Sequence, residues 1–155
     1  MQRRTLVAAA AAFGLTSTAL SAFAAEKGTQ YVVLDKPLPN AEGTLIKVFS
    51  YDCPFCYKYD VGVDPRVLPR IEKEVGLKFK PMHLETKGTY GRCASVFLAM
   101  CMLRDEKAGV SIEDKNSLFK KAKAAIYNAY HRKQERWTAG ESAFLKTLTD
   151  ATGRT

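Results

Sequence analysis

Two cysteines separated by two residues are the side chains of this sequence best suited to chemistry. Cys53-Pro54-Phe55-Cys56 is a CxxC motif, and cysteines so spaced can form and break a disulfide by thiol–disulfide exchange. Residues 44–50, just before the motif, are mostly apolar and predict a buried strand, and a helical stretch begins at the motif. Unpaired N–H groups at the helix N-terminus favour a thiolate at Cys53, and Pro54 fits the first helical turn. The pattern predicts a redox-active dithiol, with Cys53 and Cys56 as the catalytic pair.

Zinc binding and a purely structural disulfide are the alternatives for a CxxC motif. A zinc site usually needs a second pair of ligands at short spacing. The remaining cysteines and histidines are spaced unlike any common zinc ribbon; they are His83, Cys93, Cys101 and His131. We therefore expect no metal and place both alternatives below redox chemistry.

Cys93 and Cys101 lie in or beside an apolar stretch that predicts a buried helix over residues 94–103. Eight residues of a straight helix span about 12 Å, whereas disulfide-bonded Cα atoms lie at most about 7 Å apart. The two cysteines are not expected to pair within an unbroken helix, and Cys101 is best explained as a small buried apolar side chain. A second structural or regulatory disulfide stays open if Cys93 precedes the helix, since exported proteins seldom keep free thiols.

The first 24 residues have the features of a secretory signal peptide. Arg3 and Arg4 are followed by a short stretch of apolar and small residues, and then by an A-x-A cleavage site that ends at Ala24. This stretch is too short and too rich in alanine to predict a membrane span, and an uncleaved anchor is the alternative. Export places the cysteines in an oxidising compartment, where a disulfide can persist.

The net charge is basic. The 155-residue chain carries a formal charge of +8, with 24 Lys and Arg against 16 Asp and Glu. Basic residues at 120–123 and 131–133 share a predicted helix with an apolar stripe, formed by Phe119, Ala122, Ile126, Tyr130 and Trp137. This pattern is typical of a solvated helix face above a core face, so we expect no nucleic-acid binding.

The elements that must position the CxxC motif are predicted from hydrophobic patterning. Strands are predicted at 31–34, 45–50 and 77–84. Helices are predicted directly after the motif and at 94–103, 112–136 and 140–151. The order strand, strand, helix, strand places the motif at the carboxyl end of a central strand, where open α/β sheets carry their sites. The predicted fold class is therefore α/β, with a thioredoxin-like start followed by helices.

Several stretches resemble the DsbA family of exported thiol:disulfide oxidoreductases. They are Gly28-Thr29-Gln30-Tyr31, Leu34-Asp35-Lys36-Pro37, and Phe49-Ser50 leading into Cys53-Pro54-Phe55-Cys56-Tyr57. The basic charge and the apolar residue between the cysteines look more like the DsbL-type branch. The resemblance implies a thioredoxin-like fold with an inserted helical domain. Residues 1–24 are then the signal peptide, 25–87 the thioredoxin-like part with the CxxC motif, and 88–155 the helical insertion domain.

The resemblance also implies a function. It points to oxidation of thiols in cysteine-containing exported substrate proteins in the periplasm, without a cofactor, and to recycling by a DsbB-like, quinone-linked membrane partner. We therefore predict a periplasmic, monomeric protein disulfide oxidase. The alternatives are a disulfide reductase or isomerase on the same fold, and a non-enzymatic metal-binding or truncated module.

Two positions depart from the family pattern. Phe55 replaces the histidine that follows the motif proline in the founding oxidase, which removes a donor to the thiolate. Lys47 stands in the preceding strand, where the family often has an acidic residue. A nearby lysine lowers the pKa of a thiol whereas an acid raises it, so Lys47 is predicted to tune the dithiol. Pro54 and Phe55, which lie between the two cysteines, are predicted to tune it as well. The alternative for Lys47 is a strand lysine that extends to solvent and has no influence on the thiols.

The end of the chain also differs from the family pattern. Thioredoxin folds carry a cis-proline loop facing the CxxC motif, and then a strand and hairpin that complete the sheet. Here the last residue is Thr155 and no proline follows Pro81. The sequence therefore predicts a C-terminally truncated fold with an incomplete sheet. We expect the 155-residue chain to be marginally stable or inactive, with the function belonging to a longer parent protein.

Overall fold

The structure is a computed structural model that describes residues 25–154. The described chain divides into two units, one ending at Pro37 and the other beginning at Leu38. In the first unit an isolated bridge joins Lys27 and Tyr31, and the Gly28 N–H donates to the Tyr31 carbonyl (2.7 Å). The predicted signal peptide lies outside the described residues.

The strand predicted at 31–34 is wrong. Within the described chain, the only bridge in this stretch is the one at Tyr31, and residues 32–34 adopt no regular structure. A short apolar run becomes a strand only where another strand supplies its backbone partners. Local composition cannot reveal whether such a partner is present.

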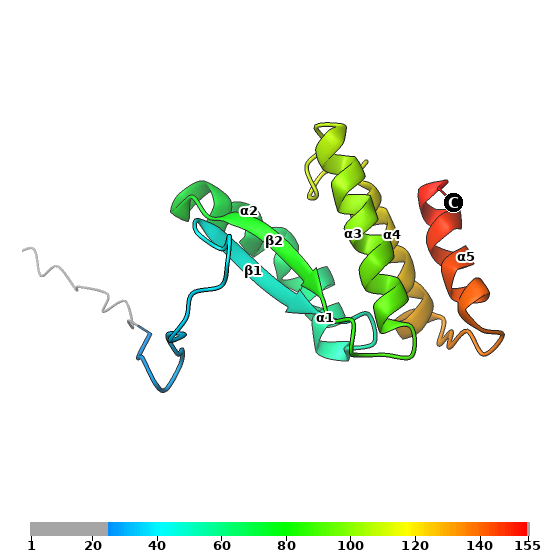
Figure 1. The fold of residues 1–155 in the computed structure, drawn as a ribbon, viewed down its shortest axis with the longest axis horizontal. Helices are drawn as coiled ribbons and strands as arrows, with labels where there is room; N and C mark the ends of the chain where they lie inside the picture. The colour runs from blue at the N-terminus through cyan, green and yellow to red at the C-terminus, as the bar shows by residue number, and fades with distance from the viewer. Residues whose placement is uncertain (1–24, 155) are drawn as a thin grey trace, which may run out of the picture. The chain divides into compact units, whose positions relative to one another are not determined.

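The second unit is built on two parallel strands (Figure 1). β1 (Thr44–Phe49) pairs with β2 (Lys78–His83), with Thr44 opposite Lys78 and Phe49 opposite His83. The connection between them contains α1 (Pro54–Gly62) and α2 (Asp64–Val75). The strands predicted at 45–50 and 77–84 are confirmed to within one residue at each end, and so is the parallel crossover that the strand order implied.

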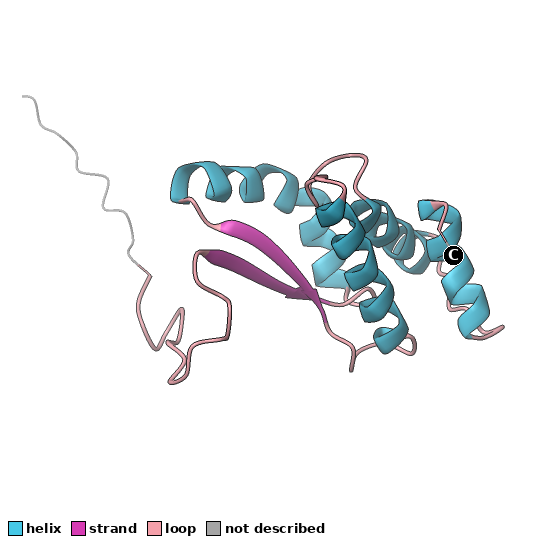
Figure 2. Ribbon diagram, turned by 45° about the horizontal axis from the view of Figure 1, so that its top comes forward, coloured by secondary structure: helices cyan, strands magenta, loops and turns pink. Residues whose placement is uncertain are grey.

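The helical region contains α3 (Gly91–Lys107), α4 (Leu118–Tyr127) and α5 (Glu141–Thr152). A π-helical turn, η1 (Asn128–Arg132), continues α4. α4 packs against both α3 and α5 (Figures 1 and 2). Of the helices in the described residues, none is both long enough and apolar enough to cross a membrane.

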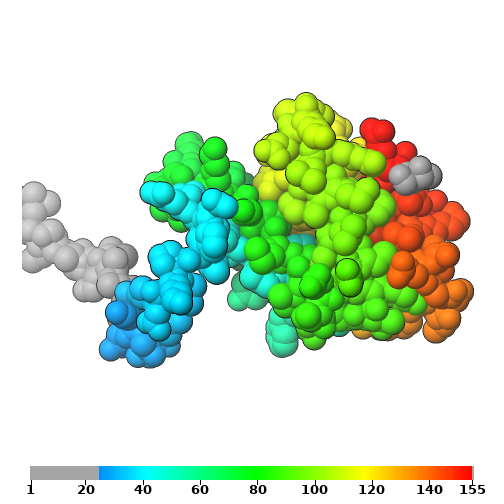
Figure 3. Space-filling view, in the orientation of Figure 1, coloured from blue at the N-terminus to red at the C-terminus, as the bar shows by residue number. Residues whose placement is uncertain are grey.

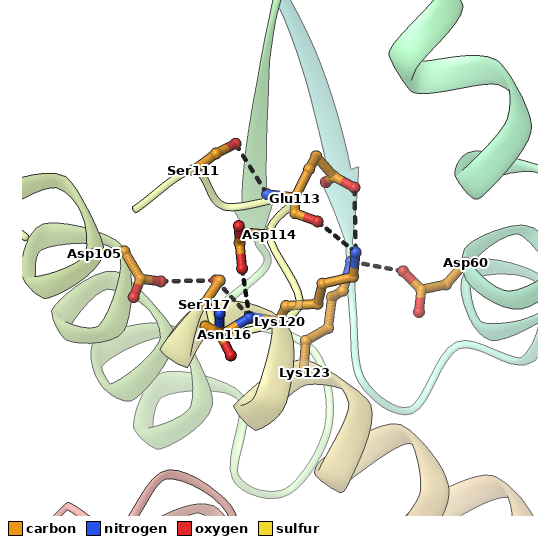
Figure 4. Close-up of polar contacts among 9 residues, drawn as sticks. All are labelled: Asp60, Asp105, Ser111, Glu113, Asp114, Asn116, Ser117, Lys120 and Lys123. Carbon is orange, nitrogen blue, oxygen red and sulfur yellow. Dashed lines mark hydrogen bonds and ion pairs between the residues drawn. The ribbon is translucent and has the colours of Figure 1, made fainter. Parts of the chain in front are cut away.

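The helix predicted to begin near Ile112 begins later, at Leu118, because a buried carboxylate fixes its start (Figure 4). Asp105 on α3 accepts hydrogen bonds from the N–H groups of Leu118 (2.9 Å) and Phe119 (3.0 Å). The Ser117 hydroxyl donates to the same carboxylate (2.7 Å), and Ser117 is the N-cap residue. These bonds satisfy N–H groups that the first turn of a helix otherwise leaves unpaired.

An ion pair joins α4 to the crossover between the strands. Lys123 Nζ lies 2.6 Å from Asp60 Oδ1 on α1, and both side chains are mostly buried (Figure 4). Lys120 Nζ donates to the Glu113 carbonyl (2.6 Å). The basic residues of this helix, predicted to form a solvated face, therefore also connect elements.

The core of the second unit is shared by the sheet and the helices. Its buried residues are Phe49, Tyr51, Ala94, Phe97, Leu98, Cys101, Phe119, Ala122, Ile126, Tyr127, Ala129, Trp137, Phe144 and Leu148. The predicted apolar stripe is confirmed along α4 and η1, where Phe119, Ala122 and Ile126 are buried and Tyr130 is half-buried. The predicted helix end near residue 136 is wrong, because the helical turns end at Arg132 and the buried Trp137 lies beyond them with φ 50°. The domain boundary predicted at residues 87 and 88 falls inside this unit and stays a prediction.

Candidate active site

The CxxC motif lies at the start of α1, as its flanking residues predicted. Cys53 is the N-cap residue, with φ −82° and ψ 115°, and Pro54 lies in the first turn. The Cys56 N–H donates to Cys53 Sγ (3.4 Å), so the sulfur occupies the place of a capping oxygen. Both cysteines are thiols in this structure. A sulfur at the positive end of a helix dipole is favoured in its anionic form.

The two sulfurs differ in acidity. Burial raises the pKa of the Cys53 thiol, but the side chain of Cys56, the backbone N–H groups of Cys56 and Phe55, and the charge of Lys87 outweigh it and leave this pKa lowered. Burial and the hydrogen bond to Cys53 raise the pKa of Cys56. The geometry therefore favours the thiolate at Cys53 and the protonated form at Cys56, which suits nucleophilic exchange.

Lys87 is a site residue that the sequence analysis missed. It lies in the loop between β2 and α3, where its Nζ is 4.0 Å from Asp52 Oδ2 and its charge lowers the pKa of Cys53. Asp52 also accepts a hydrogen bond from the Ser50 hydroxyl (2.6 Å). Parallel strands end at the same edge of a sheet, so the loop after the second strand could be expected beside the motif. The strand order could have identified this loop, although no local pattern singles out Lys87.

Lys47 lies on β1 and forms an ion pair with Asp64 at the start of α2. Its Nζ is also 5.7 Å from the centre of the Tyr59 ring. Burial and the hydrogen bond to Cys53 dominate the pKa of Cys56 and raise it, and the charge of Lys47 acts weakly in the opposite direction. The charge of Lys47 therefore affects the pKa of Cys56 more than that of Cys53. Its role in tuning the dithiol stays a prediction.

Phe55 is the exposed apolar residue of the motif. It is 70% exposed, and Lys58 Nζ lies 5.7 Å from the centre of its ring. Figure 3 shows part of the α1 segment, in cyan-green, at the surface of the molecule. An exposed aromatic ring beside a reactive sulfur can contact the apolar side chains of a bound peptide.

The segment before the motif is held by Tyr51, which is 1% exposed. Its hydroxyl accepts a hydrogen bond from the Tyr90 N–H (3.0 Å). Gly88 packs against the ring with φ +82°, and a Cβ at this position would lie 2.8 Å from the Tyr51 ring, so glycine is required here. These contacts fasten the loop that contains Lys87 to the segment that leads to Cys53. The sequence analysis did not assign Tyr51 to the site, because these are contacts between residues far apart in the chain.

Cys93 and Cys101 both lie on α3 and are free thiols, as expected for residues eight positions apart on an unbroken helix. Cys101 is 2% exposed, and burial raises its pKa to about 11. Burial also raises the pKa of the half-buried Cys93. Neither thiol is therefore activated in the way that Cys53 is. Across residues 25–154, no three His, Cys, Asp or Glu side chains gather closely enough to hold a metal ion.

Comparison with known proteins identifies relatives for nearly the whole chain, although no protein-family model matches it. The chain is 51% identical over 150 residues to the thiol:disulfide interchange protein DsbL of Escherichia coli O6:H1, and 55% identical over 145 residues to that of Lelliottia amnigena. These alignments cover 96% and 92% of this chain, and 64% and 63% of the relatives. The chain therefore spans slightly less than two thirds of the length of these relatives.

A solved structure agrees with the sequence matches. The crystal structure of Salmonella enterica serovar Typhimurium DsbL superposes with a TM-score of 0.76 and 53% identity, over 85% of this chain and 66% of that one. The thioredoxin-like fold with an inserted helical domain is thereby confirmed, and so is the resemblance to DsbL. Over the residues that it shares with these relatives, the chain is similar in sequence and fold to the DsbL thiol:disulfide interchange proteins.

Proposed function

We propose that this chain carries the dithiol site of an exported oxidoreductase that introduces disulfides into substrate proteins. The observation that carries the proposal is the position of Cys53 as the N-cap residue of α1, where its Sγ accepts a hydrogen bond from the Cys56 N–H (3.4 Å). This position accounts for the lowered pKa of Cys53, whereas the pKa of Cys56 is raised. A thiolate stabilised at the leaving sulfur favours the reduced form of the pair, which makes the corresponding disulfide an oxidant. The names of the relatives support the same class of chemistry.

The reaction begins from the Cys53–Cys56 disulfide. A substrate thiolate attacks Cys53 Sγ, the bond between the two cysteines breaks, and Cys56 leaves and takes up a proton. A second thiolate of the substrate then attacks the substrate sulfur of the mixed disulfide. The substrate disulfide forms, and Cys53 leaves as a thiolate stabilised by the start of α1. Two electrons pass from the substrate dithiol to the cysteine pair.

The resemblance to the family supports the setting of this reaction. We place it in the periplasm, with cysteine-containing exported proteins as substrates and a DsbB-like membrane protein as the oxidant that restores the disulfide. We propose that the protein uses no cofactor, because the electrons are held by the cysteine pair itself. We also propose that it is a monomer. Phe55 and Lys58, exposed at the motif, then face the substrate, and Pro54 fixes the first turn beneath them.

The proposal is tested by disulfide transfer to a reduced peptide that contains two cysteines. The oxidised chain should convert the peptide to its disulfide form, as followed by mass spectrometry. No conversion by the folded, unmodified chain would instead support the expectation that activity needs a longer parent protein. Cys53→Ser should abolish the transfer, and Cys93→Ala should transfer as the unmodified chain does. Cys56→Ser, which also lacks the disulfide, should not oxidise the reduced peptide, but its Cys53 thiol should form a mixed disulfide when the disulfide form of the peptide is supplied. Transfer that survives Cys53→Ser would refute the assignment of the site.

The redox potential of the pair separates an oxidase from a reductase on the same fold. We expect a value near that of DsbA, about −120 mV, rather than that of thioredoxin, about −270 mV. The equilibrium is measured in glutathione buffers, with circular dichroism to show that the chain is folded. A value near the thioredoxin potential would assign the site to a disulfide reductase.

A further inference from the structure

The chain contains two histidines, and both bind the backbone of the same residue. The Tyr51 N–H donates to His83 Nε2 (3.1 Å), and His131 Nε2 lies 2.8 Å from the Tyr51 carbonyl oxygen. Because a carbonyl can only accept, His131 Nε2 carries the proton and donates it to this bond. The peptide two residues before Cys53 is thus held both from the end of β2 and from the π-helical turn after α4.

His131 also contacts the other side of the motif. Its ring stacks on that of Tyr57, with the ring centres 4.8 Å apart and the planes within 5° of parallel. Tyr57 directly follows Cys56 in the sequence. A single imidazole therefore contacts the residues on both sides of the CxxC motif, through a hydrogen bond before it and a stack after it.

The position of His131 in the helical region is itself unusual. It lies in η1, where the backbone leaves α-helical geometry for one π-helical turn. π-Helical turns are rare in proteins, and those that occur often lie at functional sites. Around this turn Tyr127 also packs on Tyr57, at 5.6 Å between ring centres, so the end of α4 is joined to the start of α1 by aromatic contacts.

We propose that His131 is a positioning residue for the dithiol, fixing both ends of the motif so that Cys53 Sγ stays aligned with the N–H groups of the first turn. The inference rests on the proposed function of the cysteine pair. Hydrogen bonds to sulfur weaken steeply when donor and acceptor lose alignment. Release of the Tyr51 carbonyl would free the chain that leads to Cys53, while α1 itself stays in place. The thiolate would then lose part of its stabilisation, and the disulfide would become a weaker oxidant.

Two substitutions separate the two contacts of His131. His131→Phe keeps an aromatic ring for the stack on Tyr57 and removes the donor to Tyr51. His131→Gln keeps an N–H donor of similar reach and removes the ring. Ser117→Ala is the matched control, because it removes a buried hydroxyl and a cap from the opposite end of the same helix, α4.

The dithiol–disulfide equilibrium in glutathione is measured for each variant, together with urea unfolding. His131→Phe should shift the equilibrium toward the disulfide by about threefold to tenfold, the range expected for one lost hydrogen bond. His131→Gln should stay within about twofold of the unmodified chain, because it preserves that bond. Ser117→Ala should lower stability and leave the equilibrium unchanged.

An unchanged equilibrium in His131→Phe overturns the inference, and so does a shift of equal size in Ser117→Ala or His131→Gln. His131→Leu is a second probe if His131→Phe does not fold, since it also removes the donor to the Tyr51 carbonyl. It should shift the equilibrium in the same direction, and an unchanged value in the folded variant again contradicts the inference. If the unmodified chain shows no defined equilibrium, the proposed function fails first, and this result is distinct from a failure of the His131 variants alone.

Discussion

Cys53 and Cys56 have the same side chain and are three positions apart, yet their surroundings shift their thiol pKa values in opposite directions. Cys53 accepts hydrogen bonds at the start of α1, whereas Cys56 donates one and is the more buried of the two. This difference sets the order of the exchange steps, because the better leaving group is the sulfur with the lower pKa. The first residue of the motif thus forms the mixed disulfide and leaves as the thiolate when a second substrate thiol resolves it.

At this scale Lys87 is expected to influence Cys53 more than Lys47 does. Lys87→Met should raise the pKa of Cys53, because it removes the positive charge that favours the thiolate while keeping most of the side-chain volume. The shift should shrink as salt is added, since Lys87 is exposed. It is measured by titrating the ultraviolet absorbance of the thiolate.

Lys47→Met is the matched comparison for that titration. The charge of Lys47 acts on Cys56, so this variant should raise the pKa of the second cysteine and leave that of Cys53 nearly in place. A larger effect of Lys47→Met than of Lys87→Met on the Cys53 titration would contradict this division of roles.

At the scale of elements, the loop between β2 and α3 is held against the motif by one close approach. Gly88→Ala should lower the free energy of unfolding, because the added Cβ meets the Tyr51 ring and the backbone is already at φ +82°. The expected loss is about 2 to 4 kcal/mol, from the steric contact and the left-handed backbone together. Urea unfolding provides the measurement.

Gly109→Ala is the control that measures the cost of the left-handed backbone conformation without a steric contact. Gly109 has φ +66°, but nothing lies within 4 Å of a Cβ added there. Its substitution should cost only about 1 kcal/mol. Equal losses in the two alanine variants would show that the contact between Gly88 and Tyr51 does not hold the loop.

The elements were predictable where the signal is local. β1, β2 and the helix after the motif follow from apolar runs and from the CxxC position, because periodicity reports which face of an element is buried. The start of α4 depends on Asp105, which accepts a hydrogen bond from the N–H of Leu118, thirteen residues later in the chain. The strand wrongly predicted at 31–34 would have needed a partner strand. Composition carries no information on such distant partners.

The same limit separates the predicted from the missed parts of the site. The cysteine pair and Phe55 are adjacent in sequence and were found from spacing and chemistry. Tyr51 and His131 meet across 80 positions of the chain, so only the folded structure brings them together. Lys87 is intermediate, because strand order predicts its loop but not its side chain.

At the scale of the whole molecule, His83 links stability to pH. Burial lowers the pKa of His83 to about 4, although the charge of Asp52 acts in the opposite direction. An unfolded histidine has a pKa of about 6.5. Between about pH 6.5 and about pH 4 the unfolded chain therefore binds a proton that the folded chain does not, and the free energy of unfolding falls as pH falls. Above about pH 6.5 this contribution is fully present.

The expected loss across this window is about 2 kcal/mol, after allowance for partial solvent screening. Protonation of His83 also removes the acceptor for the Tyr51 N–H, so the structural and electrostatic effects have the same sign. Urea unfolding at about pH 7 and about pH 4.5 should show a steeper change for the unmodified chain than for His83→Gln. Equal pH dependence in the two proteins would assign the change to other groups.

The most direct test of the account is to assign the low thiol pKa to one of the two motif cysteines. The thiolate absorbance is titrated in Cys53→Ser and Cys56→Ser, each in a background that carries Cys93→Ala and Cys101→Ala. Cys56→Ser should retain a transition below the ordinary cysteine pKa of about 8.5, and Cys53→Ser should show only a transition at or above it. If the low transition follows Cys56, or if neither variant has one, the central claim that Cys53 is the stabilised thiolate is wrong.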